Sequence, residues 1–386
     1  MRAKVAVVRC PAYETRQLHD AVGGSLELIG GLGSVIARGS RVFVKINHLS
    51  PASPPERAII THPLFTRQVL AFLKDLGAEI VVGDDIGSES VDGFEVSGYD
   101  AMCREMGVRL INLRSAGFRE VPCPGGEALK SVHVSSAVLD ADAIVDLPKL
   151  KTHSFTAFTG AVKNMFGVIP CGSRHDLHSR FPASEAFGRM LVDVFACVPP
   201  HLTLMDGIVA MEGFGPAAGS ARHVGLVLAG RDAVAVDAVA QDIAGFGPGD
   251  VETSASAGRR GLGAADPGDI EIAGVALAEA RVKRFRKAAI PVGLLKRRLP
   301  AALYARLQGQ LVLSPEVVPA ACTDCRECVN ACPCEAVVIE DGRARILEEA
   351  CIRCLCCHEA CRSGAIRLRP RPGGRAVRIL ASLFRH

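Results

Sequence analysis

The sequence is poor in aromatic residues and carries little net charge. Its 386 residues include no tryptophan and three tyrosines, and the formal net charge is +4 at pH 7. Proteins that bind nucleic acids commonly use aromatic side chains for base stacking or carry a recognisable binding motif. The sequence contains neither feature, and we expect no nucleic-acid partner.

Long apolar segments are also missing. No run of about eighteen apolar residues occurs, which is the minimum for a membrane-spanning helix. The start of the chain, Met1-Arg2-Ala3-Lys4 before a short valine-rich stretch, is too short for a secretory signal. The expected compartment is therefore the cytoplasm.

The first 280 residues alternate between short apolar runs and stretches of helical periodicity. This alternation is typical of a layered α/β domain with a largely parallel sheet. Strands are predicted at residues 5–8, 41–46, 79–82, 108–112, 143–146, 202–205 and 224–228. Helices are predicted at residues 63–76, 98–106, 184–197 and 232–244.

The composition changes after residue 280. Residues 281–386 hold 20 of the 45 Lys and Arg residues but only 9 of the 41 Asp and Glu residues. We divide this part into a basic linker (281–318), a cysteine-rich α+β domain (319–370) and a basic tail (371–386). The mixed basic and apolar residues of the linker and tail suit peripheral contact with an anionic membrane, or packing of the linker against the acidic body.

Ten of the fifteen cysteines lie between Cys322 and Cys361. Eight of them form two runs of the pattern C-x2-C-x2-C-x3-C, offset by 29 residues. In this pattern three closely spaced thiolates bind one [4Fe–4S] cluster, and the fourth ligand comes from the other run. The sequence therefore predicts two [4Fe–4S] clusters, with ligand sets Cys322, Cys325, Cys328, Cys361 and Cys351, Cys354, Cys357, Cys332.

Three details qualify this interpretation. Pro333 follows Cys332 as the pattern expects, whereas Arg362 replaces the second proline and would leave one cluster more exposed. Cys334 and Cys356 lie outside the pattern and are interpreted as spectators. Zinc is the alternative metal, since C-x2-C pairs also bind zinc, but the duplicated order of eight cysteines fits it poorly.

The cysteine-rich domain resembles the bacterial two-cluster ferredoxins over about 50 residues. The resemblance implies a ferredoxin-like fold and one-electron transfer at low potential, on the order of −400 mV.

Polar residues in the body follow the predicted strands. In open α/β sheets the ligand crevice lies beyond the carboxyl ends of the strands. The candidate catalytic side chains are lysines that would bind an anion, and carboxylates or a histidine that would move protons: Lys45, Asp85, Lys149, Lys151, His153, Lys163, Asp206 and Glu212. The segment from Thr159 to Asn164 is also predicted to start a helix whose free N–H groups hold a phosphate or carboxylate.

Each signal has a structural alternative. Asp84 and Asp85 could cap a helix or form a turn, and Lys45 and Lys149 could be solvated strand ends. His62 is interpreted as a helix-start residue. His175 and His178 have metal-ligand spacing, but a surface loop is favoured. The remaining cysteines are expected to be small buried residues: Cys10, Cys103, Cys123, Cys171 and Cys197.

Taken together, several blocks resemble the domain of unknown function 362 family. They are Thr61-His62-Pro63, Gly83-Asp84-Asp85, Pro148-Lys149-Leu150-Lys151-Thr152-His153 and Gly160-Ala161-Val162-Lys163-Asn164. The resemblance spans nearly the whole chain and implies a body of this size joined to a ferredoxin-like C-terminus. It supplies no reaction.

Three hypotheses follow for function. The first is an iron–sulfur oxidoreductase that takes electrons from a ferredoxin, flavodoxin or reductase and delivers them to a small anionic substrate in the α/β body. The second is a non-catalytic electron carrier or cluster-assembly partner whose body is a docking domain. The third is a racemase-like or transferase-like body with the clusters as a redox sensor.

Overall fold

The computed structural model describes residues 2–49, 53–86, 93–288, 300 and 312–370. Most of the predicted basic linker lies outside these residues. So does the whole of the predicted basic tail.

The body is built on a ten-stranded sheet with the order β12-β1-β11-β10-β7-β2-β3-β4, and β8 and β9 extend from β10. Most neighbouring strands are parallel, including the series β10, β7, β2, β3 and β4. The prediction of a layered, largely parallel α/β body is confirmed, and the antiparallel pairs β1–β11, β10–β11 and β8–β9 are the exceptions. The bounds are β1 Ala3–Arg9, β2 Arg41–Ile46, β3 Glu79–Asp84, β4 Arg109–Asn112, β7 Ala143–Leu147, β8 Lys149–His153, β9 Ala157–Thr159, β10 Leu202–Glu212, β11 Ser220–Gly230 and β12 Ile270–Gly274.

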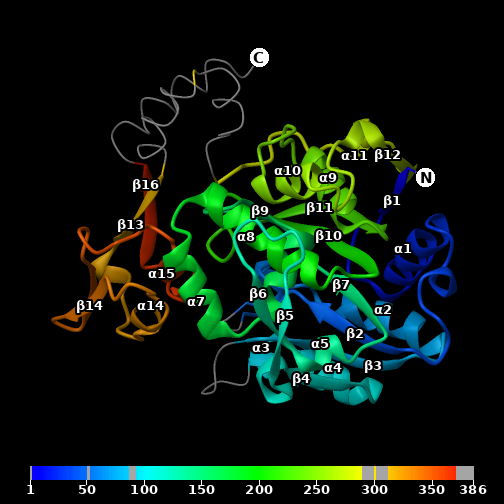
Figure 1. Ribbon diagram of the computed structural model, residues 1–386, viewed down its shortest axis with the longest axis horizontal. Coiled ribbons are helices and arrows are strands. Elements are labelled where there is room, and N and C mark those ends of the chain that lie inside the picture. Colours follow the sequence, from blue (N-terminus) through cyan, green and yellow to red (C-terminus); the bar gives the residue numbers. More distant parts are fainter. Residues whose placement is uncertain (1, 50–52, 87–92, 289–299, 301–311, 371–386) are drawn as a thin grey trace.

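Helices cover both faces of the sheet (Figure 1). Because side chains alternate along a strand, Val44 of β2 joins one apolar cluster and Phe43 joins another. The Val44 cluster includes residues of α1, α2 and α4, and the Phe43 cluster includes residues of α8. The bounds are α1 Thr15–Leu28, α2 Pro63–Asp75, α3 Gly93–Ser97, α4 Tyr99–Met106, α5 Ser136–Leu139, α6 Ala161–Asn164, α7 Cys171–Arg180, α8 Ser184–Cys197, α9 Ala233–Ile243, α10 Glu252–Arg259 and α11 Leu277–Ala280.

The C-terminal region forms small antiparallel sheets that are separate from the central one. Strands β13 (Leu313–Val317) and β16 (Ile366–Pro370) pair with each other, as do β14 (Val337–Glu340) and β15 (Arg343–Ile346). Two short helices, α14 (Glu327–Asn330) and α15 (Cys356–Ala360), carry the third cysteine of each run. We call residues 312–370 the module, and the preceding α/β part the body.

Every predicted strand and helix of the body is present, and β2 and α8 have the predicted bounds. The main elements that the prediction missed are α1, the hairpin of β5 (Phe118–Pro122) and β6 (Ser131–Ser135), and β8 with β9. Of these, β8 matters most for function because it carries Lys149, Lys151 and His153.

Asp193 of α8 stabilises the loop that leads into β6. Its fully buried carboxylate accepts hydrogen bonds from the backbone N–H groups of residues 127–129 at 2.7–3.0 Å. It also forms an ion pair with Arg260 at 2.7 Å.

Replacing this carboxylate should destabilise the body. Because Asp193→Ala leaves Arg260 and three backbone donors without their acceptor, we expect it to lower the free energy of unfolding by about 3–5 kcal/mol. Urea denaturation followed by circular dichroism measures this. Asp20→Ala, on the exposed face of α1, is the control and should change stability by less than about 0.5 kcal/mol.

Candidate functional site

Two buried lysine–carboxylate pairs lie at the carboxyl ends of the central strands. Lys45, at the end of β2, lies 2.9 Å from Asp84 at the end of β3, and both side chains are almost completely buried. Lys149 of β8 lies 2.7 Å from Asp206 of β10, again in full burial. The alternative interpretation of Lys45 and Lys149 as solvated strand ends is therefore wrong.

Asp206 is the centre of the second pair's hydrogen bonding. Its carboxylate accepts hydrogen bonds from the Tyr13 hydroxyl at 2.8 Å and from the backbone N–H groups of His62 and Ile208. Lys149 also donates to the Tyr13 oxygen at 2.8 Å. These contacts fix both charges in place.

Strand β8 directs three ionisable side chains to one side. Lys149, Lys151 and His153 occupy alternate positions, so they share one face of the strand. All five residues of β8 are buried. The strand therefore forms a row of basic groups inside the protein.

Lys151 differs from Lys149 in its partners. Its ammonium group donates to the backbone oxygen of Ile59 at 2.7 Å. Burial, reinforced by the nearby charge of Lys163, lowers the pKa of Lys151 from its usual value to about 7. Near neutral pH this lysine is thus divided between its charged and neutral forms.

His153 connects the body to the module. Its Nδ1 accepts hydrogen bonds from the N–H groups of Phe155 and Thr156, which places the ring proton on Nε2. Nε2 lies 3.4 Å from Oε1 of Glu359, a residue of the module. Burial and the charges of Lys163 and Lys151 hold the pKa of His153 well below its usual value, so the ring is neutral.

Lys163, in α6, completes this group. Glu359 acts electrostatically on both Lys163 and Lys151 and favours their charged forms. Neither His153 Nε2 nor Glu359 Oε1 has a hydrogen-bond partner among the described residues. We use the name cationic pocket for the group of side chains Lys151, His153 and Lys163, and not for a cavity.

Two predicted residues have other partners. Asp85 forms ion pairs with Arg174 at 3.0 Å and with Arg114 at 3.4 Å. Its neighbour Asp84 pairs with Lys45. Glu212, at the end of β10, is bound by Arg286 at 2.8 Å. The structure therefore places Lys45, Lys149, Lys151, His153, Lys163 and Asp206 in the buried row or beside it, and gives Asp85 and Glu212 arginine partners.

The predicted anion site at the start of α6 already contains a carboxylate of the protein. Asp237 of α9 accepts hydrogen bonds from the N–H groups of Ala161 at 2.6 Å and Val162 at 3.0 Å. A Cβ at Gly160 would approach Asp237 to 2.0 Å, so glycine is required there. The expectation that these N–H groups bind a phosphate or carboxylate ligand is therefore wrong.

Asp146 and Asn164 belong to the site and were not proposed as functional residues from the sequence. The amide of Asn164 donates to Asp146 at 2.6 Å, and its oxygen accepts from Asn47 at 3.0 Å. Burial raises the pKa of Asp146 well above its usual value, which favours a neutral carboxyl group. Asp146 is the last residue of the predicted strand at residues 143–146. A polar residue at a strand end was the sequence feature that could have identified it as part of the site.

Other predicted residues are structural. His62 caps α2 by accepting a hydrogen bond from the Leu64 N–H, as expected. His175 and His178 lie in α7, and His178 is buried against Phe187 with ring centroids 4.2 Å apart, so the favoured surface loop is wrong. Of the cysteines outside the module, Cys10, Cys103 and Cys123 are buried, whereas Cys171 and Cys197 are partly exposed.

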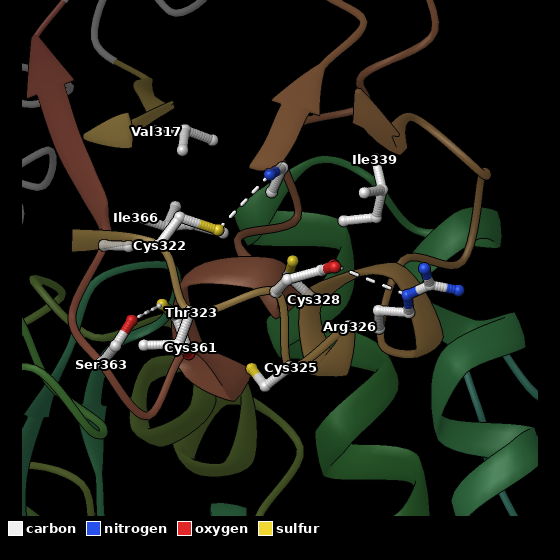
Figure 2. Close-up of a pocket in the computed structure, with 13 residues that line it drawn as sticks. Val317, Cys322, Thr323, Cys325, Arg326, Cys328, Ile339, Cys361, Ser363 and Ile366 are labelled. Atoms are coloured by element: carbon white, nitrogen blue, oxygen red, sulfur yellow. Dashed lines mark hydrogen bonds and ion pairs between the residues drawn. The ribbon is translucent and has the colours of Figure 1, made fainter. Parts of the chain in front are cut away.

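The module brings cysteines of both runs around one hollow. Figure 2 shows Cys322, Cys325, Cys328 and Cys361 around this hollow, and Val317, Ile339 and Ile366 are among its apolar lining residues. The N–H of Ala344 donates to the Cys322 sulfur at 3.4 Å. The set is the one that the crossed ligand rule selects.

The remaining four cysteines of the pattern also lie near one another. The charges that raise the pKa of Cys357, after burial itself, are those of Cys354, Cys351 and Cys332, and then of Cys328. The N–H of Ala336 donates to the Cys332 sulfur at 3.2 Å. We call the first set site 1 and the second set, Cys351, Cys354, Cys357 and Cys332, site 2.

No three His, Cys, Asp or Glu side chains in the described ranges lie close enough to hold one metal ion. No helix in that part of the chain is long and apolar enough to cross a membrane.

Comparison with known proteins identifies the family. The model of the family described as a domain of unknown function (DUF362) matches residues 42–242. The chain belongs to this family. It is also 31% identical over 264 residues to a thylakoid-associated protein of Synechocystis sp., and the match covers 68% of this chain and 81% of the relative.

Two solved structures are also similar. The lactate racemase apoprotein of Thermoanaerobacterium thermosaccharolyticum is 14% identical with a TM-score of 0.40, covering 60% of this chain and 54% of the racemase. A protein of Thermotoga maritima is 16% identical with a TM-score of 0.36, covering 58% of this chain and 57% of that protein. The chain thus spans little more than half of each solved structure.

The lowered pKa of Lys151 predicts a pH-dependent stability. Between pH 7 and 10.5 the unfolded chain keeps the Lys151 proton and the folded chain has released it, so stability should rise with pH in this window. The contribution is at most about 1.4 kcal/mol per pH unit. Lys151→Met should remove this slope, as measured by urea denaturation at a series of pH values. An unchanged slope would show that Lys151 titrates normally.

Proposed function

We propose that the protein is an iron–sulfur oxidoreductase in which the module relays electrons to a small anionic substrate in the α/β body. The observation that carries the proposal is the position of Glu359. It lies between two cysteines of the ligand pattern and reaches the cationic pocket of the body. The cysteine-rich module and the buried basic residues of the body are thus in contact at Glu359 and His153.

The cysteines fit two [4Fe–4S] clusters. Site 1 gathers three cysteines of the first run and the last cysteine of the second around a largely apolar hollow. Backbone N–H groups point at sulfurs in both sites, and such hydrogen bonds tune the potential of bound clusters. Bound clusters would supply one-electron transfer at low potential.

The cationic pocket suits an anionic substrate. Lys151 and Lys163 would bind its charged group, in a buried setting where electrostatic attraction is strong. His153, neutral with its proton on Nε2, can donate that proton or a hydrogen bond to charge that develops on reduction. Lys45 and Lys149 are already neutralised by Asp84 and Asp206, so they position the strand ends.

A cytoplasmic location with peripheral membrane contact is part of the proposal. The Synechocystis relative is described as thylakoid-associated. The basic and apolar residues of segments 281–318 and 371–386 would suit the surface of an anionic bilayer.

Anaerobic reconstitution tests the cluster assignment. The full chain should bind about eight irons and give EPR signals of reduced cubanes, since each of two clusters holds four irons. Cys328→Ser should lose about half of this iron, whereas Cys334→Ser, which alters a cysteine outside the pattern, should retain it. Fewer than about six irons in the unaltered chain would contradict two cubanes.

The substrate pocket is tested by Lys163→Met. Metabolite profiling of a deletion strain should reveal an accumulated oxidised anion, and the purified, reduced protein should consume it. We expect Lys163→Met to lower kcat/KM by about tenfold to a thousandfold with unchanged iron content, because it removes a positive charge from the cationic pocket. Lys130→Met, at an exposed position, is the control. Equal activity of the two variants would favour the non-catalytic carrier.

A further inference from the structure

The two cysteine runs have the same backbone but different surroundings. The residues on either side of the second cysteine have positive φ in both runs: Asp324 and Arg326 in the first (53° and 59°), and Arg353 and Leu355 in the second (58° and 68°). The internal repeat is therefore a structural repeat. Differences between matched positions then reflect what each run faces.

The second cysteine of each run shows the first difference. Cys325 is the one exposed cysteine among the described residues, and it belongs to site 1. Its counterpart in the repeat, Cys354 of site 2, is 6% exposed. The neighbours differ in the same way, because Arg326 is exposed and its counterpart Leu355 is 2% exposed.

Leu355 is buried against the body. It belongs to the same apolar cluster as Phe166 and Leu177 of the body. A second contact with the body comes from the end of the first run, where Ser179 of α7 donates a hydrogen bond to the backbone oxygen of Pro333 at 3.2 Å. Pro333 follows Cys332, which is a ligand of site 2, so both contacts place residues next to site 2 ligands at the inner surface of the module.

The position two residues after the third cysteine of each run shows the same contrast. Asn330 of the first run is exposed, whereas its counterpart Glu359 reaches His153 in the cationic pocket. Cys356, outside the ligand pattern, is buried where the first run has the partly exposed Glu327. Each of these substitutions suits the second run to contact with the body and the first run to contact with solvent.

We propose that sites 1 and 2 have different tasks: a small reduced electron-carrier protein docks on the surface around Cys325 and gives one electron at a time to site 1, and site 2 passes electrons to the body. This inference rests on the proposed function. A cluster held by site 1 would gain the one electron that the carrier loses, and a cluster held by site 2 would then receive that electron and supply it to the anionic substrate. The docking surface consists of Thr323, Cys325, Arg326, Arg362 and Ser363, all exposed.

A tryptophan scan of two positions tests this assignment in the reconstituted full chain. Thr323→Trp adds bulk beside site 1, and Glu349→Trp adds the same bulk at an exposed position beside the second run. The probe is a photoreduced bacterial two-cluster ferredoxin, mixed with the oxidised chain in a stopped-flow instrument. Dithionite, a small reductant that needs no docking surface, is the reference donor.

We expect Thr323→Trp to lower the second-order rate constant with ferredoxin by about fivefold or more, because docking of two specific surfaces limits this rate. Its rate with dithionite should be unchanged, and Glu349→Trp should behave like the unaltered chain. The inference is overturned if Glu349→Trp slows the ferredoxin reaction instead, or if the two variants react equally.

A second variant covers the case in which Thr323→Trp loses iron. Arg326→Glu adds no bulk and should change the same rate constant and its dependence on ionic strength, whereas Arg16→Glu on α1 should change neither. Equal effects of these two charge reversals would also overturn the inference. Failure of the unaltered chain to bind about eight irons would instead contradict the proposed function.

Discussion

The burial of several lysines at one edge of a parallel sheet is the constraint on which the rest of the structure depends. An unpaired buried charge is very costly, so each lysine needs a partner or must lose its proton. Asp84 neutralises Lys45, and Asp206 neutralises Lys149. Lys151 and Lys163 remain, and the carboxylate that acts on both, Glu359, comes from the module. The body's electrostatics are thus completed by the module.

This arrangement links the two halves of the protein in chemical terms. Glu359 follows Cys357, the third cysteine of the second run, by two residues. Its backbone position is therefore fixed by the same segment that would bind a cluster. Glu359 contacts His153 and acts electrostatically on Cys354, so site 2 lies beside the basic groups of β8. A change of charge at site 2 would therefore alter the electrostatic potential at the cationic pocket, which we assign to the substrate.

The sequence predicted the regular elements well and the polar core less well. Strand β2 and helix α8 have clear periodicity and were predicted to the residue. Strand β8 was missed because its ionisable residues at alternate positions suggest a solvated loop, whereas both of its faces are buried. The sequence pattern did not distinguish the roles of Asp84 and Asp85: Asp84, the last residue of β3, pairs with Lys45, whereas Asp85 pairs with Arg174 and Arg114. The role of Asp237 depends on a contact between residues 76 positions apart, which no local pattern reveals.

Anomalous diffraction at the iron absorption edge, from an anaerobic crystal of the reconstituted full chain, tests the central claim most directly. The account predicts iron at two positions, one among Cys322, Cys325, Cys328 and Cys361, and the other among Cys351, Cys354, Cys357 and Cys332. It also predicts that the second position is the nearer to Glu359 and His153. Iron at a single position, or a first site nearer to the cationic pocket than the second, would contradict it.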